Sequence, residues 1–170
     1  GAIAKFSPIM TEVIGFANSG GYVMGVCNGF QILTESGLLP GALLHNDSHK
    51  FICKNTYLKA ETKNTLVTNQ YTKKAIKIPI AHGEGKYFAD EETMKSLIQN
   101  DQILFKYCDE HGHITNEANP NGSLLNIAGV CNVNRNVFGM MPHPERSADK
   151  ELNNQDGLTL FKSILTVILP

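Results

Sequence analysis

This chain is short of charge. Of its 170 residues, 18% are charged, and the formal net charge is -1. A nucleic-acid-binding protein normally shows a basic face, which this composition does not supply. The chain also lacks a signal peptide at its start and any run of about 18 consecutive apolar residues, the length of a membrane-spanning helix. We therefore expect neither a nucleic acid nor a membrane among its partners.

Closely spaced cysteines are lacking too. The chain has four cysteines: Cys27, Cys53, Cys108 and Cys131. None belongs to a C-x-x-C pair, so we expect neither a zinc site nor a redox dithiol. Because 42% of the residues are hydrophobic, the chain can build a core without disulfides, and we expect a reducing, cytoplasmic setting. We interpret Cys53, Cys108 and Cys131 as small buried apolar residues, which leaves Cys27 for chemistry.

The hydrophobic pattern predicts one α/β domain over residues 1–170. The chain opens with helix, strand, turn and helix, an order typical of a doubly wound sheet, and its middle reads as a smaller antiparallel β section. No repeat or linker divides it. The expected helices are 2–17, 28–36, 90–100 and 156–169, and the expected strands are 22–26, 51–60, 75–82, 86–88, 102–108, 127–133 and 137–141.

A glycine-flanked cysteine lies where the first strand meets the following helix. Gly25, Cys27 and Gly29 form the pattern G-x-C-x-G, which is typical of a nucleophile held at a sharp, strained strand-to-helix turn. Small residues two positions away on each side make room for that turn. The start of the helix favours a thiolate, and the backbone N–H of Asn28 is a candidate oxyanion donor. The alternative is a buried cysteine in a glycine-rich turn without chemical significance.

The base that a thiol needs is best supplied by His143. It follows the apolar strand 137–141, and prolines on both sides restrict its backbone. In an extended segment Glu145 would point the same way and hold the imidazole in one tautomer. By itself this segment is better explained as a rigid proline turn with a surface His and Glu. Because both segments follow buried strands, the carboxyl edge of the sheet would bring together a Cys27–His143–Glu145 triad.

These residues resemble the class I (triad) glutamine amidotransferases, which carry G-x-C-x-G-x-Q and a later H-P-E. The matching segments here are Gly25–Gln31 and His143–Glu145. The resemblance implies a flavodoxin-like, mostly parallel sheet with helices on both faces and a smaller antiparallel β section. It also implies that Gln31 helps to bind L-glutamine, together with Asn28, and that Cys27 forms a γ-glutamyl thioester.

Further segments narrow the resemblance to the glutaminase subunits of phosphoribosylformylglycinamidine synthase, a family of purine biosynthesis. These are 27–33, 46–53, 79–85, 119–123 and 140–146, with A-H-G-E-G and N-P-N-G-S as the discriminating elements. The resemblance implies that ammonia from glutamine passes to a synthetase subunit, with or without a small accessory subunit. ATP and Mg²⁺ would be bound by that synthetase, and we expect no cofactor or metal in this chain, which has no Walker A motif.

The resemblance also carries a departure. Relatives begin with roughly fifty further residues, about the length of an extra βαβ unit, which supply the first strands and a second oxyanion donor. We expect this chain to lack them. Two alternatives to the active glutaminase subunit of this synthase stay open: a non-catalytic docking fragment, and the glutaminase of another class I amidotransferase.

Four other polar residues are weaker candidates. Two ligand types in a glycine loop are too few for a metal site, so we expect His82 and Glu84 to lie near the synthetase interface or the ammonia exit. The alternative is a plain structural turn. Asn46 and Ser48 would line the glutamine pocket or the interface, or else belong to a polar loop without further role.

Overall fold

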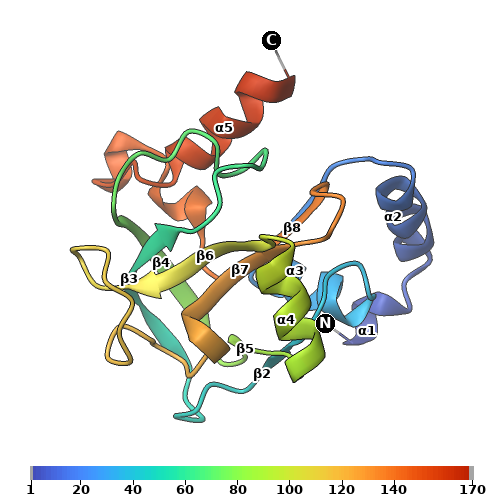
Figure 1. The fold of residues 1–170 in the computed structure, drawn as a ribbon, viewed down its shortest axis with the longest axis horizontal. Coiled ribbons are helices and arrows are strands. Elements are labelled where there is room, and N and C mark those ends of the chain that lie inside the picture. Colours follow the sequence, from blue (N-terminus) through green and yellow to red (C-terminus); the bar gives the residue numbers. More distant parts are fainter. Residues whose placement is uncertain (1, 169–170) are drawn as a thin grey trace.

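A curled six-stranded sheet forms the centre of the computed structural model, which describes residues 2–168 (Figure 1). The strand order is β1-β8-β7-β6-β3-β4, and β2 and β5 form a separate two-stranded sheet. The strands are β1 Val23–Val26, β2 Ala42–Leu44, β3 Ile52–Ala60, β4 Ile76–His82, β5 Lys86–Phe88, β6 Ile103–Cys108, β7 Ile127–Cys131 and β8 Val137–Met140.

The helices account for the remaining regular structure. The α-helices are α1 Ala2–Lys5, α2 Pro8–Asn18, α3 Asn28–Glu35, α4 Glu91–Gln99 and α5 Leu158–Ile168, and the 3-10 helices are η1 Leu124–Asn126, η2 Pro144–Ser147 and η3 Lys150–Leu152. Asp90 begins α4 as expected, because its side chain accepts a hydrogen bond from the backbone of Thr93 at 2.7 Å.

The sheet is mixed. In the described part of the chain β1 and β8 form its parallel pair, with Val26 opposite Met140, and the other neighbouring strands run antiparallel. The α/β class is as expected. The sheet has fewer parallel pairs than the mostly parallel sheet that was predicted. The strands β3 and β4 join the main sheet, and the separate antiparallel section consists of β2 and β5.

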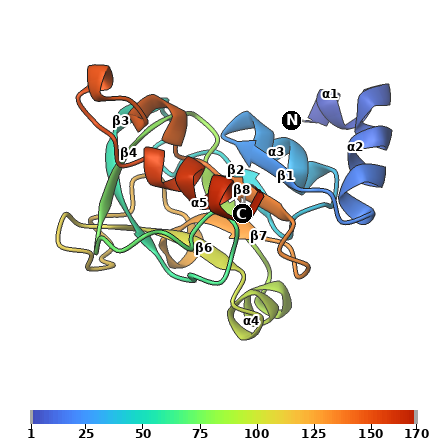
Figure 2. The ribbon, with the colours of Figure 1, turned by 90° about the horizontal axis from the view of Figure 1, so that it is seen from above.

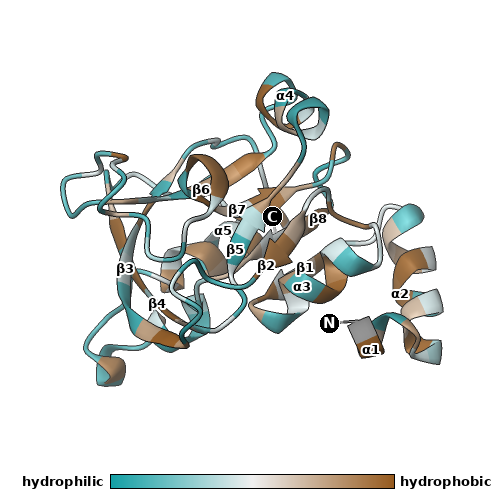
Figure 3. Ribbon diagram, turned by 90° about the horizontal axis from the view of Figure 1, so that it is seen from below, coloured by the Kyte–Doolittle hydropathy of each residue, from teal (hydrophilic) through white to brown (hydrophobic). Residues whose placement is uncertain are grey.

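Helices cover both faces of the sheet. Phe30 and Leu33 of α3 pack in one buried cluster with Leu97 of α4, whereas Leu160 of α5 belongs to the cluster on the other face. Side chains alternate between the two clusters along β7 and β8, as a sheet covered on both faces requires. Figure 3 shows the resulting hydrophobic (brown) central strands between more polar loops.

The predicted first helix is two helices in the structure. Ser7 has an extended backbone (φ -69°, ψ 136°) because the proline at position 8 disfavours the helical conformation before it. Both pieces lie at one end of the molecule, beyond α3 (Figures 1 and 2). Their apolar face is partly exposed: Ile3 is 91% exposed and Phe6 is 82% exposed in the described chain, whereas Met10 and Ala17 are buried.

Three smaller differences concern burial and short elements. Cys53 is exposed, contrary to the prediction, because it lies on the outward face of β3, whereas Cys108 and Cys131 are buried as expected. The short strand β2 and the 3-10 helices were not predicted, since three or four residues carry too little periodicity. The predicted last helix begins at 158 rather than 156, and its final residue, 169, lies outside the described residues.

Candidate active site

Cys27 lies at a strained elbow between β1 and α3. Its backbone has φ 53° and ψ -108°, a conformation that a side-chain-bearing residue rarely adopts. Two hydrogen bonds fix the turn: the Cys27 N–H donates to the Met140 carbonyl at 2.8 Å, and the Gln31 N–H donates to the Cys27 carbonyl at 3.2 Å. The elbow therefore projects the thiol from the end of β1 at the first turn of α3.

The two flanking glycines play different parts. A Cβ at Gly25 would lie 2.5 Å from the backbone of Gly29 and 2.7 Å from Leu33 Cδ1, so α3 can approach β1 only because Gly25 has no side chain. A Cβ at Gly29 would meet nothing within 4 Å among the described residues. The prediction that the turn needs glycine on both sides is thus correct for the strand side only.

The Cys27 thiol is half-buried, and its sulfur lies 3.8 Å from the carbonyl oxygen of Ala81 in β4. Burial raises the pKa of this thiol, and the nearby Glu145 carboxylate adds to the rise, while the Asn28 backbone N–H and the Arg146 guanidinium lower it. Burial prevails, so the helix start alone does not provide a thiolate. The thiol needs a neighbouring base.

His143 follows β8 and is set up as that base. Its backbone N–H donates to the Pro79 carbonyl at 2.8 Å, and its Nδ1 lies 2.6 Å from Glu145 Oε1. Since a carboxylate only accepts, Nδ1 carries a proton, and in the neutral imidazole Nε2 holds the lone pair. Nε2 is buried and has no hydrogen-bond partner in the described chain. Glu145 reaches Nδ1 from the 3-10 turn that starts at Pro144, rather than from the extended segment that the sequence suggested.

The fold brings Cys27 and His143 to the same edge of the sheet. β1 and β8 are parallel neighbours, so Cys27 and His143 follow strands that end at the same edge. Both also contact β4, the strand at the other end of the strand order, through the carbonyls of Ala81 and Pro79. Because the sheet curls, strand β4 lies across the ends of β1 and β8 and closes the site.

Gln31 lies on α3, one turn after the cysteine. Its side-chain Nε2 donates to the Glu84 carbonyl at 2.6 Å, which ties α3 to the loop after β4. The Glu84 carboxylate points elsewhere, to His45 at 3.5 Å. There residues 43–47, His49, Glu84 and Lys86 line an open pocket of about 460 Å³. Gln31 therefore contacts the candidate site through its position on α3, and Glu84 through its backbone.

Asn46 and His82 form one buried cluster. The Asn46 Nδ2 donates to the carbonyls of Lys50 (2.8 Å) and His82 (2.9 Å), and its Oδ1 lies 3.1 Å from both the His82 ring Nδ1 and the Gly85 N–H. Burial lowers the pKa of His82 to about 4, and the neighbouring His143 contributes to the lowering. Ser48 is exposed and accepts from the Lys50 N–H at 3.3 Å, so it shapes the loop rather than joining this cluster.

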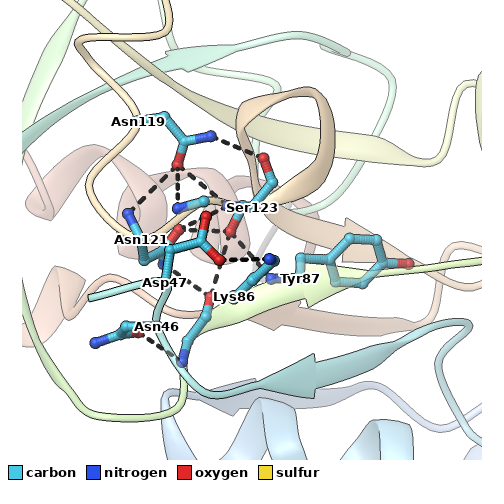
Figure 4. A network of polar contacts seen from close by, with 9 residues as sticks. Asn46, Asp47, Lys86, Tyr87, Asn119, Asn121 and Ser123 are labelled. Atoms are coloured by element: carbon cyan, nitrogen blue, oxygen red, sulfur yellow. Dashed lines mark hydrogen bonds and ion pairs between the residues drawn. The ribbon is translucent and has the colours of Figure 1, made fainter. Parts of the chain in front are cut away.

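The segment 119–123, which the sequence marked as a turn, holds the loop after β4 in place (Figure 4). Asn121 Nδ2 donates to the Gly85 carbonyl at 2.8 Å, and the Ser123 hydroxyl accepts from the Tyr87 N–H at 3.0 Å. Asn119 Oδ1 accepts backbone N–H groups of its own turn. The asparagines and the glycine predicted a turn, but no signal in the sequence identified its partner.

Sequence reasoning also missed Arg146. Its Nε lies 3.6 Å from Glu145 Oε1, and its charge lowers the pKa of the Cys27 thiol. A basic residue directly after the predicted acid was the available signal. Among residues 2–168 no three His, Cys, Asp or Glu side chains are placed to hold a metal ion. No helix in this range has the length and apolarity needed to cross a bilayer.

Comparisons with known proteins agree on one family. Residues 2–161 match the CobB/CobQ-like glutamine amidotransferase domain. A "phosphoribosylformylglycinamidine synthase subunit PurQ" from Synechocystis is 56% identical over 96% of this chain and 73% of its own length, and one from Chlorobium luteolum is 53% identical over 96% and 71%. The PurLQS structure from Thermotoga maritima matches with a TM-score of 0.83 and 42% identity, covering 99% of this chain and 72% of that chain. The chain belongs to the CobB/CobQ-like glutamine amidotransferase family, and its fold is that of a glutamine amidotransferase.

Proposed function

We propose that this chain is the glutaminase subunit of a phosphoribosylformylglycinamidine synthase, which hydrolyses L-glutamine to glutamate and ammonia. The high sequence identity to relatives of that name, over most of the chain, supports this activity. The observation that best supports this reaction is the 2.6 Å contact between His143 Nδ1 and Glu145. It is made at the same edge of the sheet as the strained elbow at Cys27.

In the proposed mechanism Cys27 attacks the side-chain amide carbon of glutamine. The free Nε2 of His143 takes the thiol proton and returns it to the nitrogen that leaves as ammonia. Glu145 keeps the imidazole in the tautomer that this requires and stabilises its charged form. The γ-glutamyl thioester on Cys27 is then hydrolysed by water, for which His143 again acts as base.

Asn28 and Gln31 are the proposed substrate contacts. The Asn28 backbone N–H lies close enough to the sulfur to lower the pKa of the thiol, so it also lies close to the carbon that the sulfur attacks. It is placed to donate to the developing oxyanion. Gln31 already donates to Glu84 through Nε2, which leaves its Oε1 to accept from the α-amino group of glutamine.

The ammonia is proposed to pass to a synthetase subunit, with a small accessory subunit as a further partner. That synthetase would bind ATP and Mg²⁺ and form the amidine of formylglycinamide ribonucleotide, with the complex in the cytoplasm. Support for a partner is the match to a structure described as PurLQS. Asn46, Ser48, His82 and Glu84 lie on or beside the loops 45–50 and 82–86, next to the site, and we propose them as pocket or interface residues.

The test is labelling of Cys27 by a glutamine-like diazo ketone in the complex with the synthetase, read by peptide mass spectrometry. We expect one adduct per chain, on Cys27, and glutamine-dependent formation of the amidine. Cys27→Ala should abolish both, whereas Cys53→Ala, which removes an exposed cysteine on β3, should change neither. Absence of an adduct in the complex would refute the glutaminase, and turnover with a different acceptor only would refute the named synthetase.

A further inference from the structure

His82 is the last residue of β4 and is buried. The residue is 3% exposed. The ring lies flat against Gly85, where an added Cβ would be 2.3 Å from His82 Cε1, so the loop can close over the imidazole only because residue 85 is glycine. The chain thus encloses an imidazole for which the mechanism above has no use.

The hydrogen bonds of Asn46 determine which nitrogen of His82 carries the proton. Two carbonyls, those of Lys50 and His82, face the Asn46 Nδ2, which identifies that atom as the amide nitrogen. The Asn46 Oδ1 therefore accepts, and it already accepts from the Gly85 N–H. The His82 Nδ1 that faces the same oxygen must donate, so Nε2 holds a lone pair.

This lone pair is unused, and it belongs to a residue next to the candidate site. His82 Nε2 has no hydrogen-bond partner among the described residues. The preceding residue, Ala81, accepts from the Cys27 thiol, and His143 is near enough to affect the ring's electrostatics. A buried acceptor without a partner is costly, and such groups concentrate where a ligand completes them. Since burial lowers the pKa of His82 to about 4, it remains neutral near neutral pH.

We propose that His82 Nε2 accepts a hydrogen bond from the carboxamide nitrogen of glutamine and holds that nitrogen as it leaves. This inference rests on the proposed glutaminase function. In the tetrahedral intermediate the nitrogen has two hydrogens and one lone pair, and the lone pair must face His143 to receive its proton. A hydrogen-bond acceptor that faces one of the two N–H hydrogens holds the nitrogen in that orientation.

The step then balances. The C–N bond breaks and its electron pair goes to nitrogen, the proton from His143 completes ammonia, and the carbonyl re-forms as the thioester to Cys27. His82 gains and loses no proton. Because His82 Nε2 accepts a hydrogen bond and supplies no proton, the product leaves as ammonia rather than ammonium.

The experiment compares two substrates that form the same thioester in the complex with the synthetase. L-Glutamine carries the N–H that His82 would accept, whereas glutamate γ-methyl ester releases methanol and has no such hydrogen. His82→Asn keeps a donor near Nδ1 and removes the Nε2 position, and His82→Gln places an amide oxygen near Nε2. We expect His82→Asn to lower kcat/KM for glutamine about ten- to a hundredfold more than for the ester, and His82→Gln to restore part of that difference.

The control is His111→Asn, which alters an exposed histidine in the turn after β6 and should leave both substrates unaffected. The ratio of the two kcat/KM values is measured on one preparation, so partial loss of folded protein cancels. An equal fall for glutamine and ester, or no fall for glutamine, would overturn the inference while leaving the proposed function intact. Failure of the unaltered complex to hydrolyse glutamine would overturn both.

Discussion

Replacing Gly25 with alanine should separate α3 from β1 and so disturb the cysteine elbow. The new Cβ would lie 2.5 Å from the carbonyl carbon and oxygen of Gly29 and 2.7 Å from Leu33 Cδ1. Carbon atoms pack at about 3.5–4.0 Å, so the helix must move by roughly 1 Å. Overpacking usually costs about 1–3 kcal/mol. Because two of the three contacts are backbone atoms that cannot rotate away, we expect the upper end, about 3 kcal/mol.

The assay is thermal unfolding followed by circular dichroism, because the chain has no tryptophan to report by fluorescence. A loss of 3 kcal/mol should lower Tm by about 6–12 °C in a domain of this size. We also expect glutamine hydrolysis to fall at least tenfold at a temperature where the variant is folded, since the elbow positions the thiol.

Gly29→Ala is the matched control, four residues away on the same turn. Its Cβ would meet nothing within 4 Å, and the position is helical. Alanine is favoured over glycine in a helix by about 0.5–1 kcal/mol, so Tm should rise slightly and hydrolysis should persist. Equal Tm values for the two variants would refute the reasoning from close approach at Gly25.

Three further outcomes are expected. Glu145→Gln should lower kcat for glutamine about ten- to a hundredfold. This is less than the roughly 10⁴-fold loss known for a buried acid, because the Glu145 side chain is 49% exposed and water screens the effect of its charge on His143. An unchanged kcat in steady-state kinetics would contradict the triad. Asn46→Ala should lower the free energy of unfolding by about 2–4 kcal/mol, since it leaves several buried polar groups unpaired; urea unfolding measures this. The rate at which iodoacetamide alkylates Cys27 should rise with pH, with an inflection above the ordinary thiol pKa, because burial raises the pKa of Cys27 and favours the neutral thiol. Peptide mass spectrometry measures the rate, with the exposed Cys53 as reference. Faster alkylation of Cys27 than of Cys53 at neutral pH would contradict this.

The sequence predicted the local parts of the site well because their signals are local. The glycine pattern around Cys27 placed a strand before it and a helix after it, and both are present as β1 and α3. The prolines around His143 predicted a restricted backbone. Glu145, however, reaches the His143 ring from a 3-10 turn rather than from an extended segment. In each case the residues that determine the conformation are within three positions of the functional side chain.

The long-range contacts could not be read in this way. Nothing in the sequence pairs Asn46 with His82, 36 positions later, or places Asn121 on the Gly85 carbonyl. The curl of the sheet is also invisible, because periodicity reports which face of a strand is buried but not which strands lie side by side. For the same reason, the apolar spacing of α1 and α2 does not show what covers their apolar face, which is partly exposed.

The curl explains why an antiparallel strand belongs to a site otherwise built at the ends of parallel ones. β1 and β8 align Cys27 and His143, but the acceptors of the Cys27 thiol and of the His143 backbone N–H lie on another strand. β4 arrives from the far end of the sheet and supplies two carbonyls, two residues apart, that face the same way, as alternate carbonyls of a strand do. The next residue along the strand is His82, so the same strand that accepts from the catalytic pair also carries the imidazole nitrogen that has no partner in the described chain. A substitution that shifts the register of β4 by one residue would therefore remove the two carbonyl acceptors and the imidazole nitrogen together, because every side chain and carbonyl would change sides.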